Sequence, residues 1–317
     1  MDTPKLNTFV IPIIRPDCIE RCLETLYKYT PDNFYVYIID QTVKGIDYNL
    51  RDRYRNLMII RTPKTDVHYT GNLGFAQATN LGAQLVQTPY FTMCNDDVEF
   101  LNPKWWKGVE DTFAMVEKAT PKRPAVIVNP SSTRLPDWSI GKASGEHHDI
   151  IPYKTEYTDE DWEFLINEDH YVNEHLTILP GSVMDGVTMY CSVCDTKKFI
   201  ECGMLCEKFW PGSGEDYDFS CRSSMFGYRS VGTTLSYVFH RWSTSFKAIQ
   251  DEDDVKSLMI PELNWNRTDE KWGPGFDIWG IRCKECNEIM HTEDGRKATC
   301  SKGHTIYQMP ETTVEEL

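Results

Sequence analysis

The clearest evidence for the fold is the stretch of residues 89–97, PYFTMCNDD, in which a short apolar run is followed directly by Asn95, Asp96 and Asp97. Aromatic and other apolar residues bounded by a proline and a polar turn favour a buried β-strand. Two carboxylates at the end of a strand can hold Mg²⁺ or Mn²⁺ against a diphosphate. Acidic pairs at this place are also common as turn formers and helix caps, so this stretch alone leaves both interpretations open.

The N-terminal side of this stretch alternates between apolar strands and amphipathic helices. The expected elements are strands over Thr8 to Ile14, Phe34 to Asp40, Leu57 to Arg61 and Pro89 to Cys94, with helices over Asp17 to Tyr29 and Leu73 to Val86. Alternation at this spacing predicts right-handed crossovers and a doubly wound, mostly parallel α/β sheet flanked by helices. Ligands bind such sheets at the carboxyl ends of the strands, where Asp40 and Asp96-Asp97 fall.

The C-terminal side has a less regular pattern. Ser131 to Leu179 mixes proline, acidic and aromatic residues, and we expect it to be rich in loops. Regular elements are then expected as strands over Val183 to Ser192 and Tyr228 to Phe239, and as helices over Asp195 to Cys202 and Glu215 to Phe226. We expect three parts: a main α/β domain over 1–245, a linker and packing segment over 246–281, and a small module with a tail over 282–317.

Composition limits the class of protein. The chain has 317 residues, a formal charge of −15 and 11 cysteines. This charge argues against a general grip on nucleic acid, although it leaves room for a local basic groove. An odd cysteine count without a disulfide framework, and the lack of an apolar run long enough to span a bilayer, predict an intracellular, cytoplasmic protein with reduced thiols.

Two further stretches could carry chemistry. Gly71 to Asn80 enters a helix with free backbone N–H groups that favour an anion, although an ordinary helix start has the same pattern. Gly82 in that helix indicates close packing or a nearby ligand. Gly212 to Asp218 delivers acidic side chains to another helix start, either as helix-capping residues or as a general base.

Taken in order, these motifs resemble the inverting family 2 glycosyltransferases with the GT-A fold, in particular their rhamnosyltransferase-like branch, over Thr8 to Ser245. The resemblance implies a metal-dependent hexosyl- or pentosyltransferase that uses a nucleoside diphosphate sugar. It assigns Asp97 to the divalent Mn²⁺ or Mg²⁺, and it assigns to the nucleotide the residues Pro12, Asp40, Asn72, Gly74, Asn80 and Asp96, with Asp96 near the ribose.

The later motifs extend the resemblance. Gly181 to Asp185 is similar to the strand that lines the acceptor side, and Glu215-Asp216 looks like the Glu-Asp pair, with Asp216 as the catalytic base. His240, followed by Arg241, Ser243 and Ser245, resembles the late segment in which an imidazole joins the metal and diphosphate. Two departures are Asn95 at the first position of the Asp-x-Asp element and the segment Ser131 to Leu179, which has no clear counterpart and could recognise the acceptor.

The C-terminal module has the spacing of a zinc ribbon. Cys283, Cys286, Cys300 and His304 could form a closed, structural Zn²⁺ site, with His291 as a substitute for His304. The alternative is a metal-free tail with reduced thiols. Such a module could contact a partner, an acceptor or nucleic acid.

The predicted function is therefore an inverting glycosyltransferase. The acceptor hydroxyl could belong to a glycan, a small molecule, a protein or a modified base in DNA, and the sequence leaves the sugar and the oligomeric state open. The first alternative is a catalytically inactive nucleotide-binding or zinc-ribbon interaction protein, against which Asp97, Asp216 and His240 speak. The second is a nucleotidyltransferase, which would carry a basic, glycine-rich loop after Ile14, where this chain has only Arg15.

Overall fold

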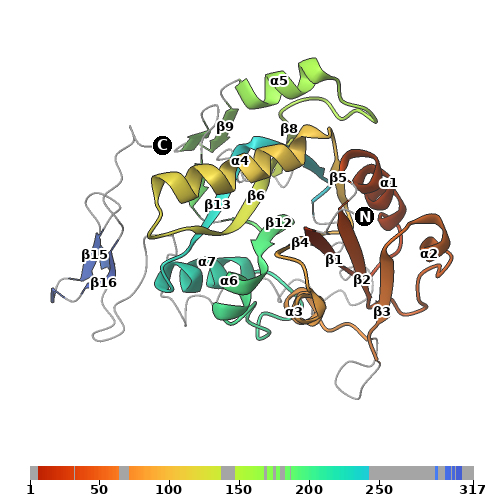
Figure 1. The fold of residues 1–317 in the computed structure, drawn as a ribbon, viewed down its shortest axis with the longest axis horizontal. Coiled ribbons are helices and arrows are strands. Elements are labelled where there is room, and N and C mark those ends of the chain that lie inside the picture. The colour runs from red at the N-terminus through yellow and green to blue at the C-terminus, as the bar shows by residue number, and fades with distance from the viewer. Residues whose placement is uncertain are drawn as a thin grey trace.

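One mixed sheet organises the chain. The structure is a computed structural model that describes residues 6–31, 33–63, 71–136, 147–167, 170–173, 176–178, 183–185, 187–242, 290–291, 297–300, 302–303 and 305–308. In this part of the chain a nine-stranded sheet has the order β11-β13-β6-β12-β4-β1-β2-β3, with β5 paired to β13. Figure 1 shows the sheet crossing the molecule between two groups of helices.

Five of the nine strands of this sheet lie close to predicted ones, namely those that begin at Asn7, Phe34, Leu57, Tyr90 and Arg229, whereas the strands over Val98–Phe100 and Ala125–Ser132 were not predicted. The strands are β1 (Asn7–Ile13), β2 (Phe34–Asp40), β3 (Leu57–Arg61), β4 (Tyr90–Cys94), β5 (Val98–Phe100), β6 (Ala125–Ser132), β11 (Val183–Asp185), β12 (Cys191–Asp195) and β13 (Arg229–His240). The helices around it are α1 (Ile19–Tyr29), α2 (Leu50–Arg53), α3 (Phe75–Leu85), α4 (Lys104–Ala119), α6 (Thr196–Glu201) and α7 (Glu215–Met225). The expectation of a mixed α/β fold with a mostly parallel sheet is confirmed.

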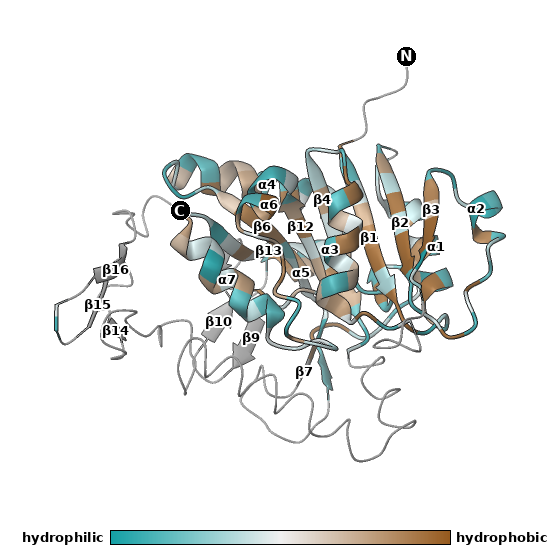
Figure 2. Ribbon diagram, turned by 90° about the horizontal axis from the view of Figure 1, so that it is seen from below, coloured by the Kyte–Doolittle hydropathy of each residue, from teal (hydrophilic) through white to brown (hydrophobic). Residues whose placement is uncertain are grey.

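Alternation along β1 separates two cores. Phe9, Ile11 and Ile13 pack with α1 and α4 in one cluster, whereas Val10 packs with α3, α6 and α7 in the other. Figures 1 and 2 show these two groups of helices on opposite faces of the sheet. Period-two alternation is what a strand buried on both faces requires.

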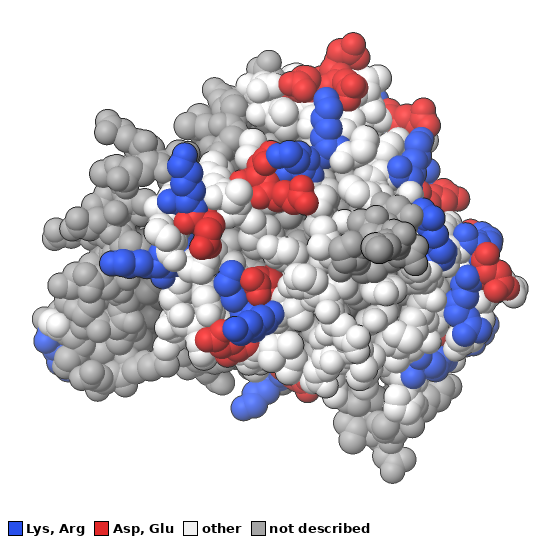
Figure 3. Space-filling model, viewed as in Figure 1, with Lys and Arg blue, Asp and Glu red and all other residues white. Residues whose placement is uncertain are grey.

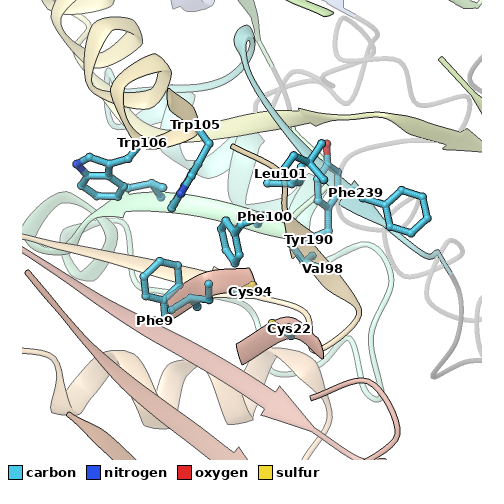
Figure 4. Close-up of a cluster of buried hydrophobic side chains, with 14 of the residues drawn as sticks. Phe9, Cys22, Cys94, Val98, Phe100, Leu101, Trp105, Trp106, Tyr190 and Phe239 are labelled. Carbon is cyan, nitrogen blue, oxygen red and sulfur yellow. The ribbon is translucent and has the colours of Figure 1, made fainter. Parts of the chain in front are cut away.

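Aromatic side chains fill the larger core, as Figure 4 shows. The ring centroid of Phe100 lies 5.7 Å from that of Phe9 and 4.7 Å from that of Trp105. Trp105 is fully buried, and its ring centroid lies 5.4 Å from that of Trp106. Both tryptophans lie in the first turn of α4, so the start of this helix packs into the core.

Gly82 of α3 lies against the sheet. A Cβ added there would meet Cγ1 of Val10 at 2.3 Å, so the glycine lets α3 approach β1. Of the two explanations that the sequence left open for Gly82, close packing is the one that the structure supports.

Two expectations about the middle of the chain were wrong. The single strand expected over Val183 to Ser192 is split into β11 and β12, because β11 pairs with β13 while β12 pairs with β4 and β6. The loop-rich segment also contains regular elements: β7 (Arg134–Pro136), β8 (His147–Asp149), α5 (Asp159–Asn167), β9 (His170–Asn173) and β10 (Leu176–Ile178). Trp162 and Leu165 of α5 are buried, and this apolar pair holds the helix on the domain.

The C-terminal module is described only in part. Its strands β14 (Met290–His291), β15 (Lys297–Cys300) and β16 (Thr305–Gln308) form an antiparallel sheet. Cys300 ends β15, while the predicted zinc ligands Cys283, Cys286 and His304 lie outside the described residues, as do Gly181, Ser243 and Ser245.

Lysines and arginines are interspersed with acidic residues over the described part of the face in Figure 3.

Candidate active site

Strand direction brings the predicted residues to one edge of the sheet. Strands β1 to β4 are parallel, β12 runs against both β4 and β6, and β13 runs parallel to β6. The carboxyl ends of β2, β4 and β13 therefore share an edge. They carry Asp40, the Asn95-Asp96-Asp97 turn and His240, and this is where ligands of open α/β sheets bind.

Asp97 and His240 form a buried pair at this edge. Their Oδ1 and Nε2 atoms are 3.1 Å apart, and each side chain is 5% exposed. Nδ2 of Asn95 lies 3.3 Å from the same Nε2. The imidazole is stacked on Tyr190, with ring centroids 4.7 Å apart, and Trp242 lies 4.4 Å from it on a tilted plane. These aromatic contacts fix the ring beside Asp97.

The Asp97–His240 pair suits a divalent cation in donor type and in spacing. Two neighbouring ligands of an octahedral ion at ~2.1 Å are ~3.0 Å apart, close to the 3.1 Å observed. Among the described residues no group of three or more His, Cys, Asp or Glu side chains is arranged for a metal ion. Nδ1 of His240 is buried and has no hydrogen-bond partner among the described residues. In a metal-bound histidine, the ring nitrogen that does not bind the metal usually donates a hydrogen bond. An ion here would need oxygen ligands from substrate or water.

Asp96 is a second carboxyl in the buried turn. Its side chain is almost fully buried, and burial, reinforced by the charge of Asp97, raises the pKa of its carboxyl well above the usual value. The pKa of the Cys18 thiol is raised to about 11, by burial first and by Asp96 and Asp97 next. A cation bound beside Asp97 would favour the ionised form of Asp96.

Asp40 is held by its own surroundings. Its fully buried carboxylate accepts hydrogen bonds from the backbone N–H and hydroxyl of Thr42, at 3.0 and 2.7 Å, and from the Ile46 N–H at 3.3 Å. Arg61 donates to it at 2.6 Å. Asp40 thus fixes the loop after β2, and its predicted contact with a nucleobase stays a prediction. Pro12 is buried in β1 opposite Ile39.

The glycine loop before α3 joins the loop before α7. Gly74 has a φ of +81°, and a Cβ on it would meet Cδ1 of Trp210 at 2.8 Å. The indole N–H of Trp210 donates to the Asn72 carbonyl at 3.3 Å, and Phe75 N–H donates to the Pro211 carbonyl at 2.7 Å. The predicted nucleotide residues Asn72 and Gly74 therefore line the same rim as the loop that leads to Glu215.

Asn80 links α3 to the segment that follows α6. Its side-chain amide accepts from the Leu205 N–H at 3.0 Å and donates to the Leu205 carbonyl at 2.9 Å and to Glu207 at 3.0 Å. The residue is buried. These contacts give Asn80 a packing role, and a role toward a nucleotide stays a prediction.

Glu215 and Asp216 begin α7 and differ in their surroundings. Burial raises the pKa of both carboxyls. Backbone N–H groups of Tyr217, Met189 and Gly214 oppose that rise at Asp216, whereas the charge of Asp216 raises the pKa of Glu215 further. Oε2 of Glu215 has no partner among the described residues. Burial therefore favours the protonated form of both carboxyls, and the charge of Asp216 favours it further at Glu215.

Met189 and Tyr190 are consecutive residues, each near one group of predicted site residues. The main chain of Met189 lowers the pKa of the Asp216 carboxyl, and the ring of Tyr190 stacks on His240. That Asp216 and the Asp97–His240 pair form one site stays a prediction.

The sequence reasoning missed three residues of this site. Glu99, in β5, is almost fully buried and binds Arg21 and Arg241 at 2.9 and 2.6 Å. Trp210 donates a hydrogen bond to the loop before α3, and Tyr190 stacks on the imidazole of His240. A glutamate between Val98 and Phe100 in an apolar stretch was the one available signal, because a buried carboxylate requires a partner.

Comparison with known proteins gives one family match. A family model described as glycosyl transferase family 2 matches residues 8–171, just over half of the 317 residues. No curated protein matches the sequence. In the described part of the chain, no helix is long and apolar enough to cross a membrane.

Solved structures match at low identity. GalNAc-T7 with UDP, GalNAc and Mn²⁺ is 13% identical with a TM-score of 0.48, and the match covers 76% of this chain but only 44% of that one. S. aureus TarS 1-349 is 13% identical with a TM-score of 0.45, or 0.47 in complex with UDP, and the matches cover 84% of this chain and 72% of that one. This chain spans less than half the length of the first protein.

Proposed function

The chain belongs to glycosyl transferase family 2, and we propose that it transfers a sugar, with inversion, from a nucleoside diphosphate sugar to a hydroxyl acceptor. The residues that we assign to this reaction are Asp97, His240, Asp216 and Glu215. The observation that carries the assignment is the buried contact of Asp97 with His240 at the carboxyl ends of β4 and β13. It supports a cation-binding pair at that edge, and the two carboxyls at the start of α7 support a base.

Asp216 is the proposed general base. The acceptor oxygen forms a bond to the anomeric carbon, its proton passes to Asp216, and the bond from that carbon to the diphosphate breaks. A single displacement of this kind inverts the anomeric carbon. In this proposal Glu215 carries the proton of the pair, and Asp216 is the carboxylate that accepts the proton of the acceptor.

Asp97 and His240 are the residues that would hold Mg²⁺ or Mn²⁺. A divalent ion there supplies positive charge to the diphosphate of the donor. Such an ion would favour the ionised form of Asp96, which is buried beside them. To the nucleotide we assign Asp40, Asn72, Gly74, Asp96, Pro12 and Asn80.

Two proposals concern the rest of the protein. Cys283, Cys286, Cys300 and His304 would form a structural zinc site, and the antiparallel pairing of β14, β15 and β16 is compatible with a ribbon. A cytoplasmic location is supported by the free cysteines of the described domain, including Cys94 and Cys191, which face each other on β4 and β12 without a disulfide.

Turnover of the donor tests the base. Wild-type protein with Mn²⁺ and a panel of nucleoside diphosphate sugars is expected to release nucleoside diphosphate from one donor. Asp216→Asn should lower this rate by ~10²–10⁴-fold while binding the nucleotide as before. Glu215→Gln, which resembles the protonated acid, should cost less than about tenfold.

Asp111→Asn is the matched control, because Asp111 is an exposed carboxylate on α4 that pairs with Lys107. It should release product at the wild-type rate. Full activity in Asp216→Asn would exclude Asp216 as the base.

A further inference from the structure

The main chain of Arg241 is hydrogen-bonded to the Asp96–Asp97 turn. Arg241 is the first residue after β13, and its backbone N–H donates to the Asp97 carbonyl at 3.2 Å. The preceding residue, His240, touches the Asp97 carboxylate at 3.1 Å. Arg241 therefore belongs to the same edge of the sheet as the Asp97–His240 pair.

One end of the Arg241 guanidinium is fixed, and the rest is accessible. Nη2 donates to Oε1 of Glu99 at 2.6 Å, where the Glu99 side chain is 4% exposed and the Arg241 side chain is 40% exposed. Its Cζ lies 5.9 Å from the ring centre of Tyr153. Nε and Nη1 have no hydrogen-bond partner among the described residues, so the group can offer N–H donors to a ligand.

Glu99 binds two guanidinium groups. Besides Arg241 it accepts a hydrogen bond from Nε of Arg21 at 2.9 Å and one from the hydroxyl of Tyr153 at 3.0 Å. Arg21 also pairs with Glu24, at 3.5 Å. Glu99 therefore positions the Arg241 guanidinium while it is shared with a second cation.

The charges of Arg241, Asp96 and Asp97 all act on one thiol. Asp96 and Asp97 raise the pKa of Cys18, after burial, while Arg241 lowers it. Cys18 is the residue before α1 and is half-buried. Together with the hydrogen bond from the Arg241 N–H to the Asp97 carbonyl, this indicates that the guanidinium lies near the two carboxyls.

We propose that Arg241, positioned by Glu99, contacts the diphosphate of the sugar donor beside Asp97. This inference rests on the proposed function. A guanidinium matches the geometry of phosphate oxygens and can bind them through two parallel N–H groups. Negative charge builds on the diphosphate as its bond to the sugar breaks, and a cation already fixed in place stabilises that charge without reorganising. If Arg241 formed only a structural ion pair with Glu99, removing its charge would weaken the fold without changing the binding of phosphate.

Binding of inorganic pyrophosphate in the presence of Mn²⁺ tests the proposal, measured by calorimetry on the full chain. Arg241→Gln should bind pyrophosphate at least about tenfold more weakly than wild type, and the best-binding nucleoside diphosphate should lose a similar factor. The matching nucleoside without phosphates should bind unchanged. Arg241→Lys should fall between the two, and Glu99→Gln should lose a smaller factor than Arg241→Gln.

Arg229→Gln is the matched control, since Arg229 lies at the opposite end of the same strand. It should bind pyrophosphate as the wild type does. If Arg241→Gln melts at a lower temperature but binds pyrophosphate with wild-type affinity, Arg241 is a structural ion pair and the inference is overturned, while the proposed function stands. If the wild type binds neither pyrophosphate nor any nucleoside diphosphate, the proposed function fails and the inference falls with it.

Discussion

Neighbouring carboxylates in the Asn95-Asp96-Asp97 turn have different partners. Asp97 contacts His240, whereas burial and the charge of Asp97 favour the protonated form of Asp96. A carboxyl whose folded-state pKa is raised stabilises the protein below its unfolded-state pKa. That contribution is lost as the pH rises through the folded-state value. Without a bound cation, Asp96 should therefore destabilise the domain at higher pH.

Asp96→Asn is expected to stabilise the metal-free protein at pH 8. The amide removes repulsion from Asp97, and we expect a gain of about 1 kcal/mol, or about 2–4 °C in Tm. The gain should shrink as the pH is lowered toward 5, which thermal melts across this range would measure.

Asp111→Asn again serves as the control, because that exposed carboxylate pairs with Lys107 on α4. A lower Tm for Asp96→Asn than for wild type at pH 8 would mean that ionised Asp96 is stabilised by its surroundings.

Part of the site could be predicted at the residue scale. Asp97 and His240 were selected by their order and motifs, and strand ends explain why they meet. That Asp216 shares their site stays a prediction. The Glu99–Arg241 pair could not be found in this way. Its partners are 142 positions apart in the chain, and no local pattern reports which arginine reaches a buried glutamate.

At the scale of elements, the pairing of α4 with β13 depends on Gly108. A Cβ at Gly108 would lie 2.0 Å from the carbonyl oxygen of Leu235, which is main chain and cannot rotate away. At Gly82 the obstacle is instead the side chain of Val10, at 2.3 Å. The two glycines therefore differ in how much the structure can adjust.

Gly108→Ala should destabilise the domain by about 3 kcal/mol or more, and Gly82→Ala by ~1–3 kcal/mol. Both losses oppose the gain of about 1 kcal/mol that alanine normally brings to a helix. Urea denaturation of the two variants and of Asp111→Ala, an exposed position on α4, would measure the difference. Wild-type stability in Gly108→Ala would contradict the packing of α4 on β13.

Elements with a clear period were predicted well, and those without one were not. The strand over Phe34 to Asp40 is found as β2 with the same bounds, because its apolar side chains face both cores. The single strand expected over Val183 to Ser192 was wrong, since an apolar run does not show where a chain leaves one strand and enters another. Helix α5 was missed because only Trp162 and Leu165 of it are buried.

At the scale of the whole molecule, the sheet places two groups of different chemistry along one edge. The Asp97–His240 pair and the Glu99–Arg241 pair each join distant parts of the chain. The parallel direction of β4, β6 and β13 brings the two pairs together. The predicted division at residues 245 and 281 stays a prediction, because the described residues do not span it.

Our central claim is that this edge binds a nucleoside diphosphate through a divalent cation at Asp97 and His240. The most direct test is the Tm of the purified chain with UDP, dTDP, GDP or CDP, with and without Mn²⁺, for wild type and Asp97→Ala. A ligand at about 100 times its Kd stabilises the folded state by about 2.7 kcal/mol. We predict that one nucleotide raises the wild-type Tm only with Mn²⁺, and that Asp97→Ala loses this response. An equal response in Asp97→Ala, or no response to any nucleotide in the wild type, would contradict the claim.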